Sequence, residues 1–133
     1  MTNLVQKNTS WLYSFWKFAR PHTVIGTTCS ILGLYLIVLS DRSLFAGGAI
    51  SVEQAGCLFS LFLTWFVCFC GNVYIVGLNQ LQDVEIDKIN KPKLPLASGE
   101  FSRNVGEFIA ILTGVLALLL SLFQGPFLAA TVW

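Results

Sequence analysis

Three residues that can bind a metal ion recur at intervals of four in the second half of the chain. They are Asn79, Asp83 and Asp87. On an α-helix, which turns by about 100° per residue, such positions lie within roughly 80° of one another. Asn72, inside the preceding apolar run, falls on the same stripe. The spacing therefore predicts one line of polar side chains on an otherwise apolar helix.

A bound divalent cation would stabilise this line of carboxylates. Asp83, Glu85 and Asp87 are expected at the C-terminal end of the helix, where the helix dipole disfavours negative charge. Carboxylates at the edge of a membrane also lose hydration unless another charge compensates them. Mg²⁺ prefers one or two carboxylates together with substrate phosphate oxygens and water. Asp83 and Asp87 could share one ion or hold two, with Asn79 as a further ligand.

The basic residues that follow the stripe leave a second interpretation open. They are Lys88, Lys91, Lys93 and Arg103. As point charges they could offset the charge of a bound phosphate group. Alternatively, they could pair with the carboxylates at a solvated helix end. The spacing alone does not decide between a metal site and such a helix end.

The composition indicates a membrane protein. Of the 133 residues, 55% are hydrophobic and 11% are charged, and the mean hydropathy is +0.71. Soluble domains carry about 25% charged residues, so this composition argues against a water-soluble surface. With a net charge of +1, we expect no nucleic-acid partner. All four cysteines lie in apolar runs, which is typical of buried thiols.

The order of apolar and polar segments predicts an all-α fold, a multi-span bundle of transmembrane helices. Three predominantly apolar runs are candidates for membrane spans, at residues 23–40, 57–78 and 105–123. A fourth apolar run begins at residue 127 and continues to the last residue. Gly26 and Gly33 are expected to permit close packing of helices.

The remaining segments are expected to lie at the membrane surface. Residues 1–22 form a cytoplasmic or interfacial segment, in which the aromatic and basic side chains of 10–20 predict a helix at headgroup level. Residues 41–56 are predicted to be a loop. Residues 79–103 are polar and carry most of the charge.

The distribution of Lys and Arg predicts which side of the membrane each segment faces. The N-terminal flank and residues 79–103 are each rich in basic residues, whereas the loop at 41–56 has only Arg42. Two intervening spans place both basic segments on one side, which the positive-inside rule makes cytoplasmic. No transit-type leader is visible in the sequence, which favours a bacterial, cyanobacterial-like membrane.

Two separate strings resemble the UbiA superfamily of intramembrane prenyltransferases. NQLQDVEIDKINKPKLPLASGE contains NxxxDxxxD followed by KPxLPLASG, which is similar to the superfamily's first aspartate-rich motif. FWKFARPHTVIGT is similar to the segment that leads into its first span. Both strings resemble the homogentisate phytyltransferases of tocopherol biosynthesis in particular. The resemblance covers residues 11–133. It implies Mg²⁺-dependent transfer of a phytyl group from phytyl diphosphate to homogentisate, with loss of the carboxyl group.

The resemblance also implies roles for the residues of the polar stripe. Asn79, Asp83 and Asp87 would be the catalytic and metal-binding set that holds Mg²⁺ and the prenyl diphosphate. Arg20 and His22 would lie at the mouth of the same cavity and contact the diphosphate or the aromatic acceptor.

The resemblance implies that residues 79–103 hold the active-site helix end and that the loop at 88–99 caps the site. A departure from the superfamily pattern falls in this loop. Leu94 stands where many members have an arginine. Leucine cannot supply a guanidinium group. Lys91 and Lys93 are therefore the candidates to bind the substrate in place of that arginine. The same departure is part of the resemblance to the homogentisate branch.

A second aspartate-rich motif, which the superfamily has in its later half, is absent from this sequence after Asp87. Residues 1–133 are therefore expected to be the N-terminal part of a single prenyltransferase domain. The missing C-terminal half of the bundle would be its partner, and we expect the chain to be inactive alone.

Three alternatives remain open. The chain could be a non-catalytic membrane protein or a transporter fragment whose helix end binds a cation or phosphate. It could be the remnant of a truncated gene. It could also be a related enzyme that uses a longer prenyl donor or another aromatic acceptor. The first alternative explains the carboxylates but not the LPLASG and RPHT segments.

Overall fold

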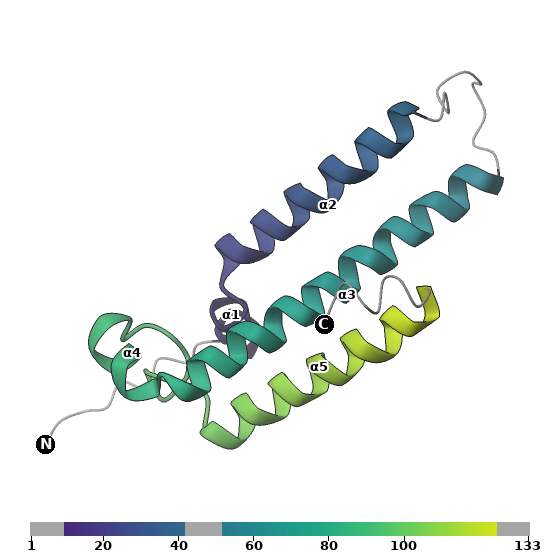
Figure 1. Ribbon diagram of the computed structural model, residues 1–133. Helices are drawn as coiled ribbons and strands as arrows, with labels where there is room; N and C mark the ends of the chain where they lie inside the picture. Colours follow the sequence, from purple (N-terminus) through teal and green to yellow (C-terminus); the bar gives the residue numbers. More distant parts are fainter. Residues whose placement is uncertain (1–9, 42–51, 125–133) are drawn as a thin grey trace, which may run out of the picture.

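A computed structural model describes residues 10–41 and 52–124, and the regular secondary structure within these ranges is entirely helical (Figure 1). The described helices are α1 (Trp11–Phe18), α2 (Pro21–Asp41), α3 (Val52–Gln82), α4 (Val84–Asn90) and α5 (Arg103–Gln124). Residues 91–102, called here the connecting loop, form a series of turns between α4 and α5. The predicted all-α fold is confirmed.

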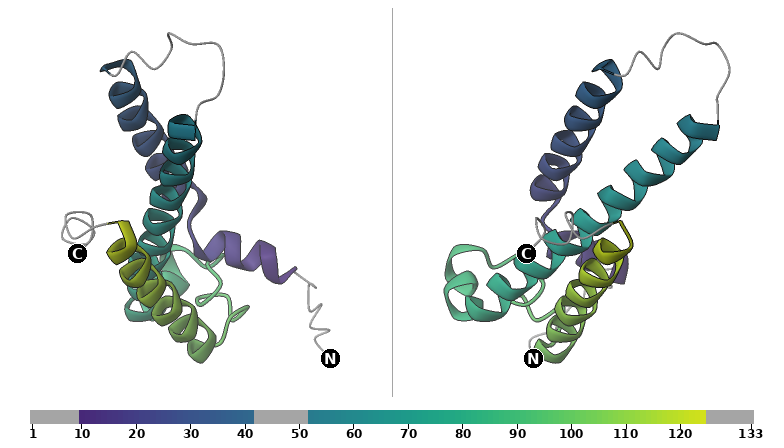
Figure 2. Two further views of the ribbon diagram at one scale, coloured as in Figure 1. Left: turned by 90° about the vertical axis from the view of Figure 1, so that its right-hand side faces the viewer. Right: turned by 45° about the vertical axis from the view of Figure 1, so that its right-hand side comes forward.

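The long helix α3 is central, and α2 and α5 lie on different sides of it (Figures 1 and 2). The packing of α3 against α5 is the more extensive of the two. A Cβ atom added at Gly114 of α5 would lie 2.8 Å from Cδ2 of Tyr74 on α3, so only glycine permits this approach. By contrast, no described atom lies within 4 Å of a Cβ added at Gly26 or Gly33. The packing role expected for those two glycines is not seen among the described helices.

Within the described residues, two helical segments have the length and hydropathy of membrane spans. They are Leu58–Gln82 in α3 and Arg103–Gln124 in α5, and they correspond to the second and third predicted runs. The first predicted run falls in α2, whose described apolar part, Pro21–Ile37, is shorter. The final predicted run, from residue 127, lies outside the described residues.

The helix α3 starts at Val52, inside the segment 41–56 that the sequence predicts to be a loop. That prediction is wrong for residues 52–56, and also for Asp41, with which α2 ends. The polar character of this segment does not by itself exclude a helix, because a helix can continue beyond the end of its apolar run. Residues 42–51 of the predicted loop lie outside the described part of the chain.

Side-chain hydrogen bonds tie α3 to its neighbours. Asn72 Nδ2 donates to Thr23 Oγ1 of α2 at 3.1 Å. About two turns earlier on α3, Thr64 Oγ1 donates to Gln124 Oε1 of α5 at 2.8 Å. Such bonds stabilise helix packing in an apolar environment. Asn72, which the sequence spacing places on the polar stripe, is thus engaged with α2.

The buried core lies where the end of α1 meets α3, α5 and the connecting loop. Its buried members are Phe18, Ala19, Val24, Val73, Leu81, Leu96, Phe101, Ile109 and Ala110. The rings of Phe18 and Phe101 lie with centroids 5.9 Å apart, which joins α1 to the connecting loop. This core holds together the parts of the chain from which the candidate site is built.

The helix α1 coincides with the surface helix that the sequence predicts at 10–20. It projects sideways from the bundle at the end where α4 and the connecting loop lie (Figure 2). Its outward side chains are aromatic or aliphatic and exposed: Trp11, Leu12, Tyr13 and Trp16. Lys17 is its one basic residue and lies in its last turn. This composition suits a helix at the membrane surface.

Candidate active site between the α1–α2 junction and the connecting loop

The polar stripe, meaning Asn79, Asp83 and Asp87, crosses a break between two helices. α3 ends at Gln82, and Asp83 precedes the first residue of α4 with φ −98° and ψ 17°. Backbone hydrogen bonds nevertheless continue at four-residue spacing, from Asp83 N to Asn79 O at 2.9 Å and from Asp87 N to Asp83 O at 2.7 Å. The register that the sequence predicts is therefore kept across the break.

This break changes one expectation about the carboxylates. Glu85 and Asp87 lie in the first turn of α4 rather than at the end of one long helix. A helix N-terminus favours negative charge, so the helix dipole does not destabilise these two side chains as predicted. The capping segment expected at residues 88–99 also begins as helix, because α4 continues to Asn90. The connecting loop starts only after that residue.

The members of the polar stripe differ in exposure. Asn79 and Asp83 are exposed, whereas Asp87 is only 4% exposed. Lys91 Nζ lies 3.4 Å from Asp87 Oδ1, and Lys88 donates to Glu85 Oε1 at 2.6 Å. These are the ion pairs that the solvated-helix alternative predicts.

The donor atoms of the stripe nevertheless suit a particular kind of metal site. Among the described residues, no group of three or more His, Cys, Asp or Glu side chains could enclose an ion. Two carboxylates and one amide on successive turns match the way proteins bind Mg²⁺ jointly with a phosphorylated substrate. In their types and spacing, these residues would suit a magnesium ion whose coordination substrate and water would complete.

A basic cavity of about 570 Å³ lies beside the stripe, between the α1–α2 junction and the start of the connecting loop. Its lining residues are Lys17, Arg20, Pro21, His22, Asn90, Lys91, Pro92, Lys93 and Leu94. The structure thus brings together all four predicted substrate-binding residues, Arg20, His22, Lys91 and Lys93, from two distant parts of the sequence. The volume lies within the usual range for small-molecule sites.

The charges of this cavity favour an anionic ligand. Four of its lining residues are lysine or arginine, and no aspartate or glutamate lines it. Arg20 can present a planar fork of donors to a phosphate or carboxylate group, whereas the lysines act as point charges. Asn79, Asp83 and Asp87 do not line the cavity, but the ion pair with Lys91 connects Asp87 to its wall. Leu94 lines it as well, at the position of the departure from the superfamily pattern.

Arg20 has an unusual backbone conformation. Its φ of 53° makes it the only described residue other than glycine with a positive φ. It lies between α1 and α2, and its carbonyl accepts hydrogen bonds from the backbone N–H and the hydroxyl of Thr23. The left-handed conformation costs a side-chain-bearing residue roughly 1–2 kcal/mol, which is why glycine is usual at such helix ends. An arginine held there suggests that its side chain is needed.

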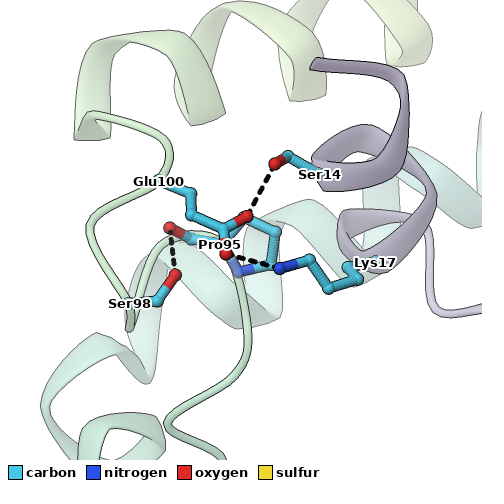
Figure 3. Close-up of polar contacts among 5 residues, drawn as sticks. All are labelled: Ser14, Lys17, Pro95, Ser98 and Glu100. Atoms are coloured by element: carbon cyan, nitrogen blue, oxygen red, sulfur yellow. Dashed lines mark hydrogen bonds and ion pairs between the residues drawn. The ribbon is translucent and has the colours of Figure 1, made fainter. Parts of the chain in front are cut away.

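The connecting loop is fixed to α1 by Glu100 (Figure 3). Ser14 Oγ donates to Glu100 Oε2 at 2.6 Å, and Lys17 Nζ donates to Oε1 at 2.5 Å. Ser98 Oγ donates to the carbonyl of Pro95 within the loop, and Pro95 is buried. One wall of the basic cavity is thereby tied to the helix that supplies Lys17.

Sequence reasoning gave no site role to Lys17 or Glu100. Lys17 lies three residues before Arg20, and this spacing was the available sign that it could reach the same cavity. Glu100 ends the string that carries the resemblance, but the α1 helix that it contacts is far away in the sequence. Only the fold shows that contact.

Comparison with known proteins places this chain in a family. The family model described as "UbiA prenyltransferase family" matches residues 42–132. The chain therefore belongs to the UbiA prenyltransferase family, and the resemblance stated above is confirmed. Members of this family are integral membrane proteins, in agreement with the helical bundle described here. No solved structure matches the chain.

Several curated relatives align with most of the chain. It is 47% identical over 121 residues to a homogentisate phytyltransferase of Synechocystis sp., covering 91% of this chain and 37% of that protein. It is 50% identical over 100 residues to the chloroplastic homogentisate phytyltransferase 1 of Arabidopsis thaliana, covering 71% of this chain and 22% of that protein. A homogentisate solanesyltransferase of Arabidopsis thaliana is 34% identical over 116 residues, covering 86% of this chain and 28% of that protein. The chain thus spans well under half the length of these relatives.

Proposed function

We propose that this chain contributes the diphosphate- and metal-binding part of a homogentisate prenyltransferase, which transfers a phytyl group from phytyl diphosphate to homogentisate in tocopherol biosynthesis. The basic cavity next to the polar stripe is the observation that carries this proposal. It gathers Arg20, His22, Lys91 and Lys93 from the two strings that resemble prenyltransferases. An anion-binding cavity beside a pair of carboxylates is the combination that a metal-bound diphosphate requires.

In this proposal the cavity residues bind and orient the diphosphate. Arg20 and the two lysines neutralise its charge, which favours departure of the diphosphate from the allylic carbon. His22 lies at the cavity wall and contacts either the diphosphate or the acceptor. The prenyl chain then extends from the cavity along the apolar helices of the bundle.

The polar stripe would hold the metal. Asp83 and Asp87 would supply carboxylate oxygens and Asn79 an amide oxygen to Mg²⁺. When bound, this ion would supply further neutralisation of the diphosphate as a leaving group. For Asp87 to take part, its carboxylate must exchange Lys91 for the ion, which leaves the ammonium group of Lys91 available to the diphosphate.

Phytyl diphosphate is the donor that the comparisons favour. Two relatives named as phytyltransferases share 47% and 50% identity with the chain, and a third, named as a probable phytyltransferase 2, shares 35%. The relative named as a solanesyltransferase shares 34%. Relatives named as geranylgeranyltransferases reach 45% and 38%, so a geranylgeranyl donor is the alternative to test. All of these relatives are named for homogentisate, which supports this acceptor.

We place the basic cavity on the cytoplasmic side of the membrane. Ser14 and Lys17 of α1 contact Glu100 of the connecting loop, so both basic segments lie at the same end of the bundle. The positive-inside rule assigns such an end to the cytoplasm. Labelling of single cysteines introduced at Lys17 and Ser98, with a membrane-impermeant reagent on sealed vesicles of known orientation, tests this placement.

Enzyme assays in membranes test the proposed activity. The chain is assayed as it is, and also as a chimera in which it replaces the aligned part of the Synechocystis homogentisate phytyltransferase. Both receive Mg²⁺, homogentisate and either phytyl or geranylgeranyl diphosphate, with the unaltered Synechocystis protein as the positive control. We expect the chimera to prenylate homogentisate and to prefer the phytyl donor.

The same assay separates this proposal from its alternative. A chimera that reaches the membrane and binds pyrophosphate, but yields no prenylated product with either donor, would contradict the proposed activity. The chain would then be interpreted as a membrane protein whose helix end binds cations or phosphate groups without chemistry.

A further inference from the structure

Gln80 is a buried polar residue for which the proposed function has no role. It lies on α3 next to the polar stripe, and its side chain is 1% exposed. Its Nε2 donates a hydrogen bond of 2.8 Å to the backbone carbonyl of Phe18. Its Oε1 is the single buried side-chain polar atom in the described residues that has no hydrogen-bond partner. A buried amide with an unpaired oxygen is destabilising, so a compensating role is expected.

The carbonyl that Gln80 binds lies at the end of α1. The last carbonyls of a helix have no partner in their own helix and need another donor. Phe18 is itself fully buried, and its ring lies against Gly77, one turn before Gln80 on α3. A Cβ atom added at Gly77 would lie 2.9 Å from Cζ of Phe18. One turn of α3 therefore holds both the ring and the carbonyl of Phe18.

A second amide of α3 holds the chain on the other side of Arg20. Asn72 Nδ2 donates to Thr23 Oγ1 at 3.1 Å. The hydroxyl of Thr23 in turn donates to the carbonyl of Arg20 at 2.8 Å. α3 is thus hydrogen-bonded on both sides of the strained residue Arg20, to Phe18 before it and to Thr23 after it.

We infer that Gln80 is a positioning residue for Arg20, because it fixes the end of α1 so that the Arg20 side chain is directed into the basic cavity. This inference rests on the proposed function, in which Arg20 binds the diphosphate. A non-glycine residue keeps a positive φ only where the surrounding structure imposes it. The hydrogen bond from Gln80 and the chain of bonds from Asn72 are the contacts that impose it here. Gln80 thereby also links the helix that carries the polar stripe to the opposite wall of the cavity.

Binding of inorganic pyrophosphate to the purified chain in detergent or nanodiscs tests the inference. Gln80→Met keeps the size and flexibility of the side chain but removes the donor to Phe18. We expect it to raise the dissociation constant for pyrophosphate about fivefold. Gln82→Met is the matched control, because Gln82 is exposed on the same helix and does not line the cavity. It should leave pyrophosphate binding unchanged.

A double-mutant cycle distinguishes positioning from a general effect on the fold. If Gln80 acts through Arg20, Gln80→Met should have almost no further effect in an Arg20→Ala background. In a Lys93→Ala background it should keep its full fivefold effect, because Lys93 lies on the connecting loop. An equal effect of Gln80→Met in both backgrounds would overturn the inference, since a merely structural residue would weaken binding whether or not Arg20 is present.

The remaining outcomes separate this inference from the proposed function. If Arg20→Ala itself leaves pyrophosphate binding unchanged, the diphosphate role of the cavity is wrong, and the inference fails with it. If Arg20→Ala weakens binding but Gln80→Met does not, only the inference fails. Should Gln80→Met not fold, Asn72→Leu replaces it in the cycle. That variant removes the other contact of α3 with the junction and should show the same dependence on Arg20.

Discussion

The polar stripe and the basic cavity are adjacent but are built in different ways. The stripe comes from three residues at four-residue spacing, and the backbone hydrogen bonds that align them are local. The cavity is assembled from the α1–α2 junction and the connecting loop, which are distant in the sequence and are joined by Glu100 and the buried core. A local change can therefore remove a ligand from the stripe, whereas the cavity also depends on contacts far from its lining.

The two regions also differ in charge and so in what they can bind. The stripe offers carboxylates and suits a cation, and the cavity offers ammonium and guanidinium groups and suits an anion. The ion pair between Asp87 and Lys91 joins the two regions across 3.4 Å. Variants that affect one region and spare the other show whether the two functions are separate.

The largest effect is expected for loss of a carboxylate from the stripe. In the chimera, Asp83→Asn should lower prenyl transfer by about a hundredfold or more, because a metal-binding carboxylate becomes a weak neutral ligand. Removal of divalent ions with a chelator should lower the rate comparably, and added Mg²⁺ should restore it only in the unaltered chimera. The product formed per minute is measured with homogentisate and phytyl diphosphate.

The control for this variant is Glu85→Gln. Glu85 lies between the two aspartates in the sequence, is exposed, and pairs with Lys88 rather than with a cavity residue. The Glu85→Gln variant should therefore show little change in the rate of prenyl transfer. Metal-free binding of pyrophosphate should also survive Asp83→Asn, because Asp83 does not line the cavity. Loss of that binding would mean that stripe and cavity are one site.

A smaller effect, confined to the cavity, is expected for Arg20→Gly. Glycine adopts a φ of 53° without strain, so the variant should be about as stable as the original chain or more stable, by up to about 1 kcal/mol. Loss of the guanidinium group should at the same time weaken pyrophosphate binding by about tenfold. Thermal unfolding in detergent and a binding titration measure the two quantities.

Opposite signs for stability and binding are the useful feature of this variant. Lys88→Met is the control for charge, because Lys88 is exposed on α4 and does not line the cavity. It should leave binding nearly unchanged. If Arg20→Gly lowers stability and binding together, Arg20 supports the fold rather than the ligand.

The stripe could be predicted from the sequence because helical spacing alone determines its geometry. Asn79, Asp83 and Asp87 keep their four-residue register even though α3 ends between them. The break itself was not predicted. Nothing in the spacing distinguishes one long helix from two helices that continue the same register, so the sign of the helix dipole at Glu85 and Asp87 was assigned incorrectly.

The cavity could be predicted only in part. Arg20, His22, Lys91 and Lys93 were identified through resemblance, and their position in one cavity agrees with it. The contacts that assemble the cavity were not identified, because they join residues far apart in the sequence. The bond from Gln80 to the Phe18 carbonyl, for example, needs a side chain and a backbone atom to meet in three dimensions. No periodic pattern in a single sequence records such a contact.

The smallest effect is expected for Glu100→Gln, which tests how the connecting loop contributes to the cavity. The ion pair with Lys17 is partly exposed, with side-chain exposures of 21% for Lys17 and 25% for Glu100, so its loss should cost at most about 1 kcal/mol of stability. Removing the carboxylate leaves the positive charge of Lys17 uncompensated at the cavity wall. Pyrophosphate should therefore bind about twofold to threefold more tightly at low salt, and less so at high salt, because salt screens this charge.

Ser14→Ala is the matched variant, because it removes a hydrogen bond to Glu100 without changing any charge. It should lower stability slightly and should not tighten binding. If Glu100→Gln instead weakens pyrophosphate binding, the loosening of the loop outweighs the change in charge. Glu100 then contributes by fixing the connecting loop and not by moderating the charge of Lys17. Either result shows how a contact outside the polar stripe determines the anion affinity of the cavity beside it.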